Sequence, residues 1–143
     1  MKLRDLMTKN VRTCRPDSPV TEAAQIMADV NCGAVPVCEG DKCVGMITDR
    51  DIVLRVVAKG EDFQTVTVRD CMTTPVITAT PDTSAQDAAE IMANKQIRRL
   101  PIVEGNRLCG IVALGDMATV RIHVDEAGQA LSNISEPAQP GAH

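Results

Sequence analysis

Apolar and polar positions follow the same order twice along the chain. Two segments carry apolar residues at the i, i+3, i+4, i+7 spacing of one helix face: Val20, Ala23, Ala24 and Met27, then Ala85, Ala88, Ala89 and Met92. These faces predict two amphipathic helices that end near residues 30 and 95. Each helix has one apolar side and therefore needs a packing partner.

The residues in front of these helices carry start signals. Ser18 is predicted to cap the first helix, which would then open with Pro19. At the second helix, Thr83 with Gln86 three residues later predicts a capping box. Both helices are therefore predicted to begin just after residue 18 or its counterpart.

Short apolar runs surround each predicted helix. Residues 11–14 and 76–79 predict a short strand that ends at Pro-Asp, and AVPVCEGDKCVGMI and RLPIVEGNRLCGIV each predict a hairpin around a Gly-containing turn. A last helix is predicted from near Asp49 to before Gly60, with its counterpart starting near Asp116. The order of elements in each copy is therefore β-α-β-β-α.

The two copies align without a gap at an offset of 65 residues. From Arg4 to Asp51, 18 of the 48 aligned positions are identical. We predict a first repeat at 1–60, a linker at 61–68, a second repeat at 69–123, and a short helix with a disordered tail at 124–143. Each copy is too small to bury a comfortable core, so the predicted fold is α/β (α+β), with two repeats packed about a pseudo-twofold axis.

Composition narrows the function classes. The chain has 143 residues, 44% hydrophobic and 24% charged, so one ordinary core is expected. A formal charge of −4 and a single aromatic residue, Phe63, argue against nucleic acid as a ligand. The sequence contains no apolar run of the ~20 residues that cross a bilayer, and we predict a cytoplasmic protein.

Six cysteines and two histidines are present, but none of the cysteines forms a Cys-x-x-Cys pair. The histidines, His123 and His143, lie near the carboxyl end, so no metal site is predicted. One interpretation treats the cysteines as small buried hydrophobes. The other predicts a disulfide between two of Cys14, Cys38 and Cys43.

One repeated segment contains polar residues that could bind a ligand. GMITDRDI at 45–52 recurs as GIVALGDM at 110–117, which keeps a glycine and an aspartate but replaces Thr48 with Ala113. Asp51 could accept hydrogen bonds from both hydroxyls of a ribose, and Thr48 at a helix start could bind ribose or phosphate. The alternative is that both residues only cap the helix. Retention of Asp116 without the threonine favours the ligand interpretation.

These features together resemble a protein family. The duplicated order of elements, Met-Thr before the first strand, Val-Pro or Leu-Pro in the second, and Gly-x-x-Thr-x-x-Asp at the last junction closely resemble a tandem pair of CBS (cystathionine β-synthase) domains, a Bateman-type module. The resemblance covers residues 3 to about 122 and is nearest to stand-alone bacterial CBS proteins. It implies a regulatory module that binds an adenine nucleotide or adenosyl ligand, such as AMP, ADP or ATP, between the repeats and needs no other cofactor.

The resemblance also assigns site residues. The first site would use Met46, Thr48, Arg50, Asp51, Val76, Ile77, Ile97, Arg98, Arg99 and Pro101. A second, weaker site would use Val11, Cys32, Pro36, Ile111 and Asp116. Apolar side chains of the first site would sandwich the adenine, and its arginines would bind the phosphates.

The second site lacks the phosphate partners of the first. Gly33 and Ala34 stand where the first site has Arg98 and Arg99, and Ala113 replaces the threonine. We therefore predict one good nucleotide site, with the Asp116 site weak, empty or suited to an uncharged adenosyl group.

Two other functions remain open, and catalysis is not predicted. The sequence has neither a paired base and nucleophile nor a Walker-type loop, so we do not predict an enzyme. A ligand-free interaction module is one alternative: the resemblance implies a homodimer through the helices, and Val53, Val56 and Val57 fit either core or dimer contacts. A thiol-based redox-responsive protein is the other. The regulated partner is not named by the sequence.

Overall fold

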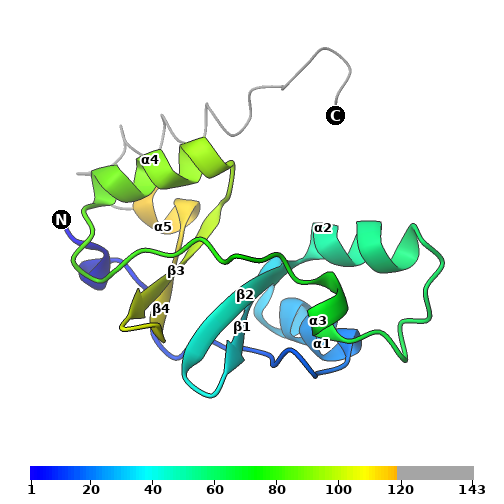
Figure 1. Cartoon of the computed structure of the whole chain (residues 1–143). Coiled ribbons are helices and arrows are strands. Elements are labelled where there is room, and N and C mark those ends of the chain that lie inside the picture. Colours follow the sequence, from blue (N-terminus) through cyan, green and yellow to red (C-terminus); the bar gives the residue numbers. More distant parts are fainter. Residues whose placement is uncertain (119–143) are drawn as a thin grey trace, which may run out of the picture. The chain divides into compact units, whose positions relative to one another are not determined.

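The computed structural model describes residues 1–118, which form two compact units (Figure 1). One unit contains Met1–Lys9, Thr78–Glu104 and the segment that starts at Cys109, and the other contains Asn10–Ile77 and Gly105–Leu108. The helix and tail predicted at 124–143 lie outside the described residues. Among residues 1–118, no helix is long and apolar enough to span a bilayer.

In the unit built on the first repeat, helices pack against a hairpin. Its elements are α1 (Val20–Val30), β1 (Ala34–Glu39), β2 (Lys42–Thr48), α2 (Asp49–Ile52) and α3 (Val68–Cys71). β1 and β2 pair antiparallel, and α2 continues as a π-helical turn over Val53–Val57. The predicted hairpin and the predicted end of the first helix near residue 30 are confirmed.

The unit built on the second repeat contains a 3₁₀ turn (Leu3–Asp5), α4 (Ala85–Lys95), β3 (Arg99–Glu104), most of β4 (Arg107–Ala113) and α5 (Leu114–Ala118). α4 lies against the β3–β4 hairpin (Figure 1). α5 begins at Leu114, two residues before the predicted start at Asp116. The strands predicted at 11–14 and 76–79 are each reduced to a single parallel bridge, Cys14 to Val37 and Ala79 to Ile102.

Each unit also contains the leading segment of the other repeat. In one unit, Lys2 bridges Ser84 and Thr8 bridges Ile111. In the other unit, the positions 65 residues away make the matching contacts, Thr67 with Pro19 and Thr73 with Met46. The exchange is therefore reciprocal, and the compact units do not coincide with the sequence repeats. All of the predicted linker, 61–68, lies in the first repeat's unit, where Val68 is fully buried.

The exchanged segments explain why one glycine recurs in each repeat. A Cβ added at Gly45 would lie 2.9 Å from Met72 Sδ and 3.2 Å from the Thr73 carbonyl oxygen. At Gly110 the corresponding distances, to Met7 Sδ and the Thr8 carbonyl oxygen, are 2.8 and 2.9 Å. The Met-Thr pair and the glycine thus recur together because the first crosses directly over the second.

The buried side chains largely follow the predicted helix faces. All four predicted positions of α4 are buried, but in α1 the predicted Ala24 is exposed and Ile26 is buried in its place. Ala24 is therefore a wrong prediction: a small side chain one position off the face centre loses little when it is left in water. Around α1, the core cluster comprises Cys14, Val20, Ala23, Ile26, Val35, Val37, Ile47, Val56, Val68 and Cys71.

Both predicted helix caps are wrong by one residue. α1 has Pro19 as its N-cap, and the Ser18 hydroxyl instead accepts a hydrogen bond from Arg15 N at 3.0 Å. α4 is capped by Ser84, which accepts from Asp87 N at 3.0 Å, while Thr83 accepts from Thr80 N. Ser18 and Thr83 thus stabilise the turn before each helix rather than the helix itself.

Ser84→Ala is expected to lower the free energy of unfolding by about 1 kcal/mol, because the amide of Asp87 loses its capping acceptor. Chemical denaturation of the purified protein measures the change. Gln86→Ala, which removes the acceptor of the capping box expected from the sequence, serves as the control and should cost less than half as much. A larger loss for Gln86→Ala than for Ser84→Ala would contradict the observed cap.

Candidate functional site

The start of α2 holds the central pair of predicted site residues. Asp51 N donates to Thr48 Oγ1 at 3.0 Å, and Thr48 N donates to Asp51 Oδ2 at 3.0 Å. The two residues therefore form a reciprocal capping box, which satisfies two backbone amides at the helix start. The Asp51 carboxylate that was predicted to bind a ligand therefore also caps α2.

A third side chain joins this pair from a distant part of the chain. The Thr73 hydroxyl donates to Asp51, at 3.2 Å from Oδ1 and 3.3 Å from Oδ2. Thr73 is brought there by its two backbone hydrogen bonds with Met46 on β2. The site prediction omitted Thr73; its recurrence as Thr8 in the aligned repeat was the signal that could have found it.

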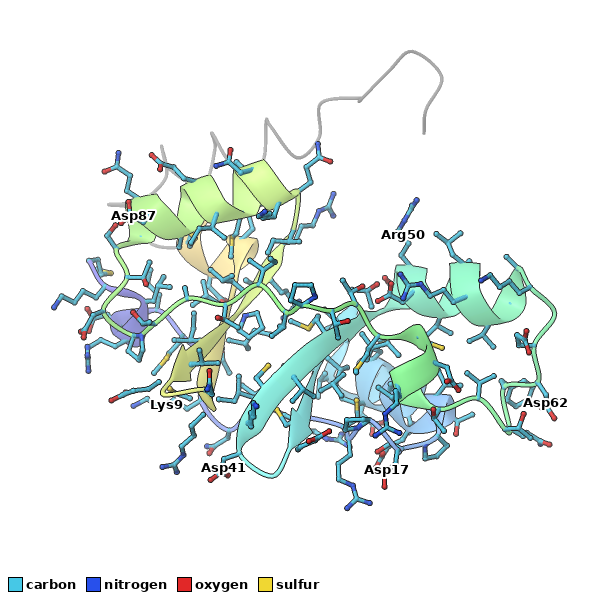
Figure 2. All side chains as sticks on the ribbon, in the orientation of Figure 1. Lys9, Asp17, Asp41, Arg50, Asp62 and Asp87 are labelled. Atoms are coloured by element: carbon cyan, nitrogen blue, oxygen red, sulfur yellow. The ribbon has the colours of Figure 1, made fainter. Side chains whose placement is uncertain are left out.

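Three apolar residues predicted for the first site lie in the same unit as this cluster. Met46, Val76 and Ile77 are all half-buried, so each keeps surface that another group can cover. Arg50 is exposed, and its side chain projects away from α2 (Figure 2). Six of the ten residues predicted for the first site therefore belong to one compact unit: Met46, Thr48, Arg50, Asp51, Val76 and Ile77.

The other four, Ile97, Arg98, Arg99 and Pro101, belong to the unit of the second repeat. Arg98 is exposed, Ile97 and Arg99 are half-buried, and Pro101 is buried. The predicted weaker site divides similarly: Val11, Cys32 and Pro36 lie in the first repeat's unit, and Ile111 and Asp116 in the second's. The predicted roles of these residues stay predictions.

The second repeat gives Asp116 a structural role. Ala113 N donates to Asp116 Oδ2 at 2.9 Å, which is the same backbone contact that Asp51 makes with Thr48. An alanine cannot supply the hydroxyl half of the box, but the carboxylate half is retained. Retention of the aspartate is therefore explained by helix capping, and it no longer favours ligand binding at Asp116.

The glycine that replaces an arginine in the first repeat also has a local cause. A Cβ at Gly33 would lie 2.8 Å from Asp49 Oδ2, so the Asp49 carboxylate occupies the space of a side chain there. In the second repeat the aligned residues are Arg98 and Leu114. Both pairs share one backbone contact, Asp49 N to Gly33 O at 2.9 Å and Leu114 N to Arg98 O at 2.8 Å. At this contact the charged side chain of the first repeat is on the amide donor, Asp49. In the second repeat it is on the carbonyl acceptor, Arg98.

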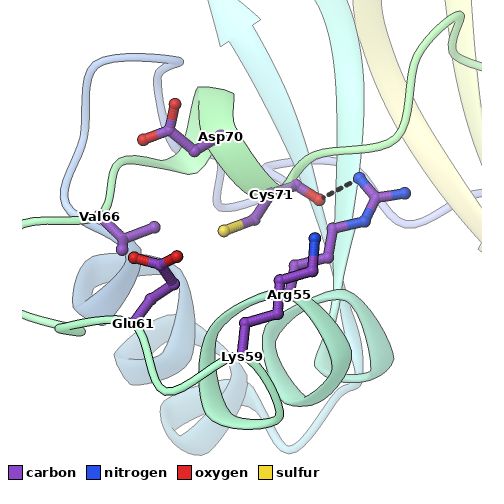
Figure 3. A pocket seen from close by; sticks show the side chains of 6 residues that line it. All are labelled: Arg55, Lys59, Glu61, Val66, Asp70 and Cys71. Atoms are coloured by element: carbon purple, nitrogen blue, oxygen red, sulfur yellow. Dashed lines mark hydrogen bonds between the residues drawn. The ribbon is translucent and has the colours of Figure 1, made fainter.

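A cavity of about 260 Å³ lies away from the predicted site, between the π-helical turn and α3 (Figure 3). Arg55, Lys59, Glu61, Val66, Asp70 and Cys71 line it. Arg55 Nη1 donates to the carbonyl oxygens of Cys71 and Met72 at 2.9 and 3.1 Å, which closes the end of α3. With two cationic and two anionic side chains, the lining attracts neither sign of charge strongly.

The thiols of the described chain are all free. Burial raises the pKa of Cys14 to about 12, with a smaller contribution from Glu22, so Cys14 stays protonated at neutral pH. Burial also raises the pKa of Cys71, and the negative charge of Asp70 adds a smaller increase. Within residues 1–118, no three His, Cys, Asp or Glu side chains are grouped so as to hold a metal ion, and His123 and His143 lie outside that range.

Comparison with protein families gives a match over most of the chain. The family described as CBS domain matches residues 3–58 and again 68–123. The CBS domain-containing protein YhcV of Bacillus subtilis is 48% identical over 133 residues, which covers 93% of this chain and 94% of YhcV. The chain is thus similar to a small protein over nearly the whole length of both.

Solved structures with the same fold are also found. Hypoxic Response Protein I, solved with two coordinated zinc ions, has a TM-score of 0.78 and 34% identity, covering 84% of this chain and 98% of that protein. CBSX2, solved in complex with AMP, has a TM-score of 0.73 and covers 87% of this chain and 98% of its own. At 22% identity, CBSX2 shows a shared fold alone.

Proposed function

The chain belongs to the CBS domain family, and from this premise we propose that it is a non-catalytic regulatory module that binds an adenine nucleotide at Asp51. CBS-domain pairs are typically regulatory, and this chain carries two CBS domains. Binding would favour one conformation of the module, and a partner protein would respond to that conformation.

The observation that carries the proposal is the hydroxyl held by Asp51. Its carboxylate already accepts a hydrogen bond from the Thr73 hydroxyl, whose distances to the two oxygens differ by only 0.1 Å (3.2 and 3.3 Å). A carboxylate offers about four acceptor positions, so a ribose diol can bind beside Thr73 or displace it. Met46, Val76 and Ile77 supply the apolar surface that an adenine ring requires.

The Asp116 site differs from the Asp51 site in sequence. Gly33 and Ala34 stand at the positions aligned with Arg98 and Arg99, and Ala113 stands at the position aligned with Thr48. The proposal therefore assigns one nucleotide to each chain. Arg98 and Arg99 are proposed to bind the phosphate, as the family resemblance implies.

Thermal denaturation with adenosine, AMP, ADP, ATP and GTP tests the proposal. A ligand at about 100 times its dissociation constant stabilises the folded protein by about 2.7 kcal/mol. For a domain of this size, that stabilisation raises the melting temperature by roughly 9 °C. AMP should stabilise more than adenosine if the arginines bind phosphate. The absence of a shift with every adenine ligand would overturn the proposal.

A ligand-free interaction module is the second candidate, and exposed apolar side chains favour it. Val56 is 1% exposed and belongs to the core, but Val53, Leu54 and Val57 on the same helical segment are 53%, 45% and 69% exposed. Burying three adjacent apolar side chains between two copies would remove them from water. Under this proposal the chain forms a homodimer through α2 and its π-helical continuation.

Val57→Asp is expected to weaken self-association at least tenfold, because a carboxylate would have to be buried in an apolar contact. Light scattering after size-exclusion chromatography at several protein concentrations measures the change. Phe63→Asp is the matched control, because it removes another hydrophobe, 57% exposed, outside that helical segment. Equal association of Val57→Asp and the unaltered chain would exclude this surface as the dimer contact.

A further inference from the structure

Two buried thiols face each other across the first hairpin. Cys38 on β1 and Cys43 on β2 are directly paired, and they are 4% and 7% exposed. Their backbone amides bond elsewhere, Cys38 N to Cys14 O at 2.8 Å and Cys43 N to Asn106 O at 3.1 Å. The cysteines are therefore a non-hydrogen-bonded pair, the arrangement in which opposite side chains come closest.

This geometry is within reach of a disulfide. The Cα atoms of a non-hydrogen-bonded antiparallel pair are about 4.5 Å apart, and disulfides join residues whose Cα atoms are about 4.4–6.8 Å apart. Little backbone movement is therefore needed to join the two sulfur atoms. The pair lies next to the Glu39–Lys42 pair that closes the hairpin.

An irregularity in β2 creates the pair. Val37 is opposite Gly45, but the next pair is Cys38 with Cys43, so Val44 is an extra residue in β2. Val44 packs against the core cluster, whereas Cys43 is not part of it. In a regular ladder Cys38 would face Val44, and the two thiols would point to opposite faces of the hairpin.

The other nearby thiol is directed differently. Cys14 bridges Val37 in parallel pairing and belongs to the core cluster with it, so it lies on the face opposite to Cys38. In the second repeat, Val103 and Leu108 occupy the positions of Cys38 and Cys43. The thiol pair is thus a property of the first hairpin rather than of the repeated fold.

We propose that Cys38 and Cys43 form a dithiol site that reacts with a two-electron oxidant, such as a peroxide, and closes an intrachain disulfide. Interaction with the Cys38 side chain lowers the pKa of Cys43, and interaction with the Cys43 side chain raises the pKa of Cys38. The Cys43 thiol donates to the Gly45 carbonyl oxygen at 3.7 Å. Because its pKa is the lower of the two, Cys43 is the attacking sulfur in this proposal.

The reaction balances with hydrogen peroxide as the only co-reactant. The Cys43 thiolate attacks one peroxide oxygen, the O–O bond breaks, and with the Cys43 proton the departing hydroxide becomes water, leaving a sulfenic acid. The Cys38 sulfur then attacks the Cys43 sulfur, its proton leaves with the sulfenic hydroxyl, and a second water forms. Two thiols lose two electrons in total, and both peroxide oxygens end as water.

Peptide mapping tests the pairing on the full-length protein. After oxidation with hydrogen peroxide, the remaining thiols are alkylated in denaturant and the protein is digested with trypsin without reduction. Cleavage after Lys42 separates residues 13–42, which contain Cys14, Cys32 and Cys38, from residues 43–50, which contain only Cys43. Trypsin leaves the Arg15–Pro16 bond intact.

The expected product is a disulfide that joins peptides 13–42 and 43–50, with fragmentation placing the bond on Cys38 and with two of the six thiols lost. Cys14→Ser should leave this product unchanged, and Cys43→Ser should abolish it. A disulfide inside peptide 13–42, a bond to another cysteine, or six alkylated thiols after oxidation of the unaltered chain would overturn the proposal. Nucleotide binding does not enter the readout, so the two proposals fail independently.

Discussion

Asp51→Ala is expected to lower the affinity for AMP roughly 10- to 150-fold. The carboxylate is the proposed acceptor for the ribose hydroxyls, and hydrogen bonds to a charged group contribute about 1.5–3 kcal/mol. Isothermal titration calorimetry with AMP on the unaltered and substituted proteins measures the change. Unchanged affinity would remove Asp51 from the site.

Asp116→Ala is the control that separates binding from folding. Both aspartates accept a hydrogen bond from the backbone amide at the start of their helix, Thr48 N at 3.0 Å and Ala113 N at 2.9 Å. Both substitutions should therefore lower the free energy of unfolding by about 1 kcal/mol. Only Asp51→Ala should lower the AMP affinity. Equal losses of affinity would show that the effect comes from stability alone.

Gly110→Ala is expected to lower the free energy of unfolding by about 1–3 kcal/mol, the usual cost of overpacking a filled site. The new methyl carbon would lie 2.9 Å from the Thr8 carbonyl oxygen, which is backbone, and 2.8 Å from Met7 Sδ. The exchanged leading segment would have to move away from β4. Urea denaturation followed by circular dichroism measures the loss.

Gly115→Ala provides the matched control five residues later. Apart from adjacent residues and the backbone of its own helix, no heavy atom lies within 4 Å of a Cβ at Gly115, which is helical in α5. The substitution should be neutral or should stabilise by up to about 1 kcal/mol, because alanine favours helix more than glycine does. A destabilisation as large as that of Gly110→Ala would contradict the crossing of the Met-Thr segment over this strand.

Periodicity predicted the helices and hairpins of both repeats because their signals are local and strong. Helix faces of three to four apolar residues and hairpins around Gly40 and Gly105 recur at a fixed offset, and the structure has them where expected. The cap predictions were wrong because adjacent residues with hydroxyl groups, such as Thr83 and Ser84, can each act as the N-cap. Which of them faces the first amides depends on the preceding turn, and a sequence pattern does not specify that turn.

Long-range contacts could not be predicted from a single sequence. Thr73 reaches Asp51 only because the leading segment of the second repeat packs in the unit of the first, and no local pattern specifies that exchange. The recurrence of an aspartate at positions 51 and 116 has two possible physical causes, ligand binding and helix capping. Asp116 keeps the backbone half of a capping box, and this role repeats whether or not a ligand binds.

The extra residue in β2 could not be predicted from the sequence either. Cys38 and Cys43 flank a turn, which indicated proximity, but alternation alone does not say whether they share a face. The position of Val44 decides this in the folded hairpin. A bulge adds one residue without changing the apolar pattern, so it leaves no periodic signal.

Equilibrium dialysis of the unaltered protein against labelled AMP tests the central claim most directly, because it counts the sites. We expect saturable binding at one AMP per chain, with the same stoichiometry for Asp116→Ala. Binding of two AMP molecules with equal affinity, or no saturable binding at millimolar AMP, would contradict it.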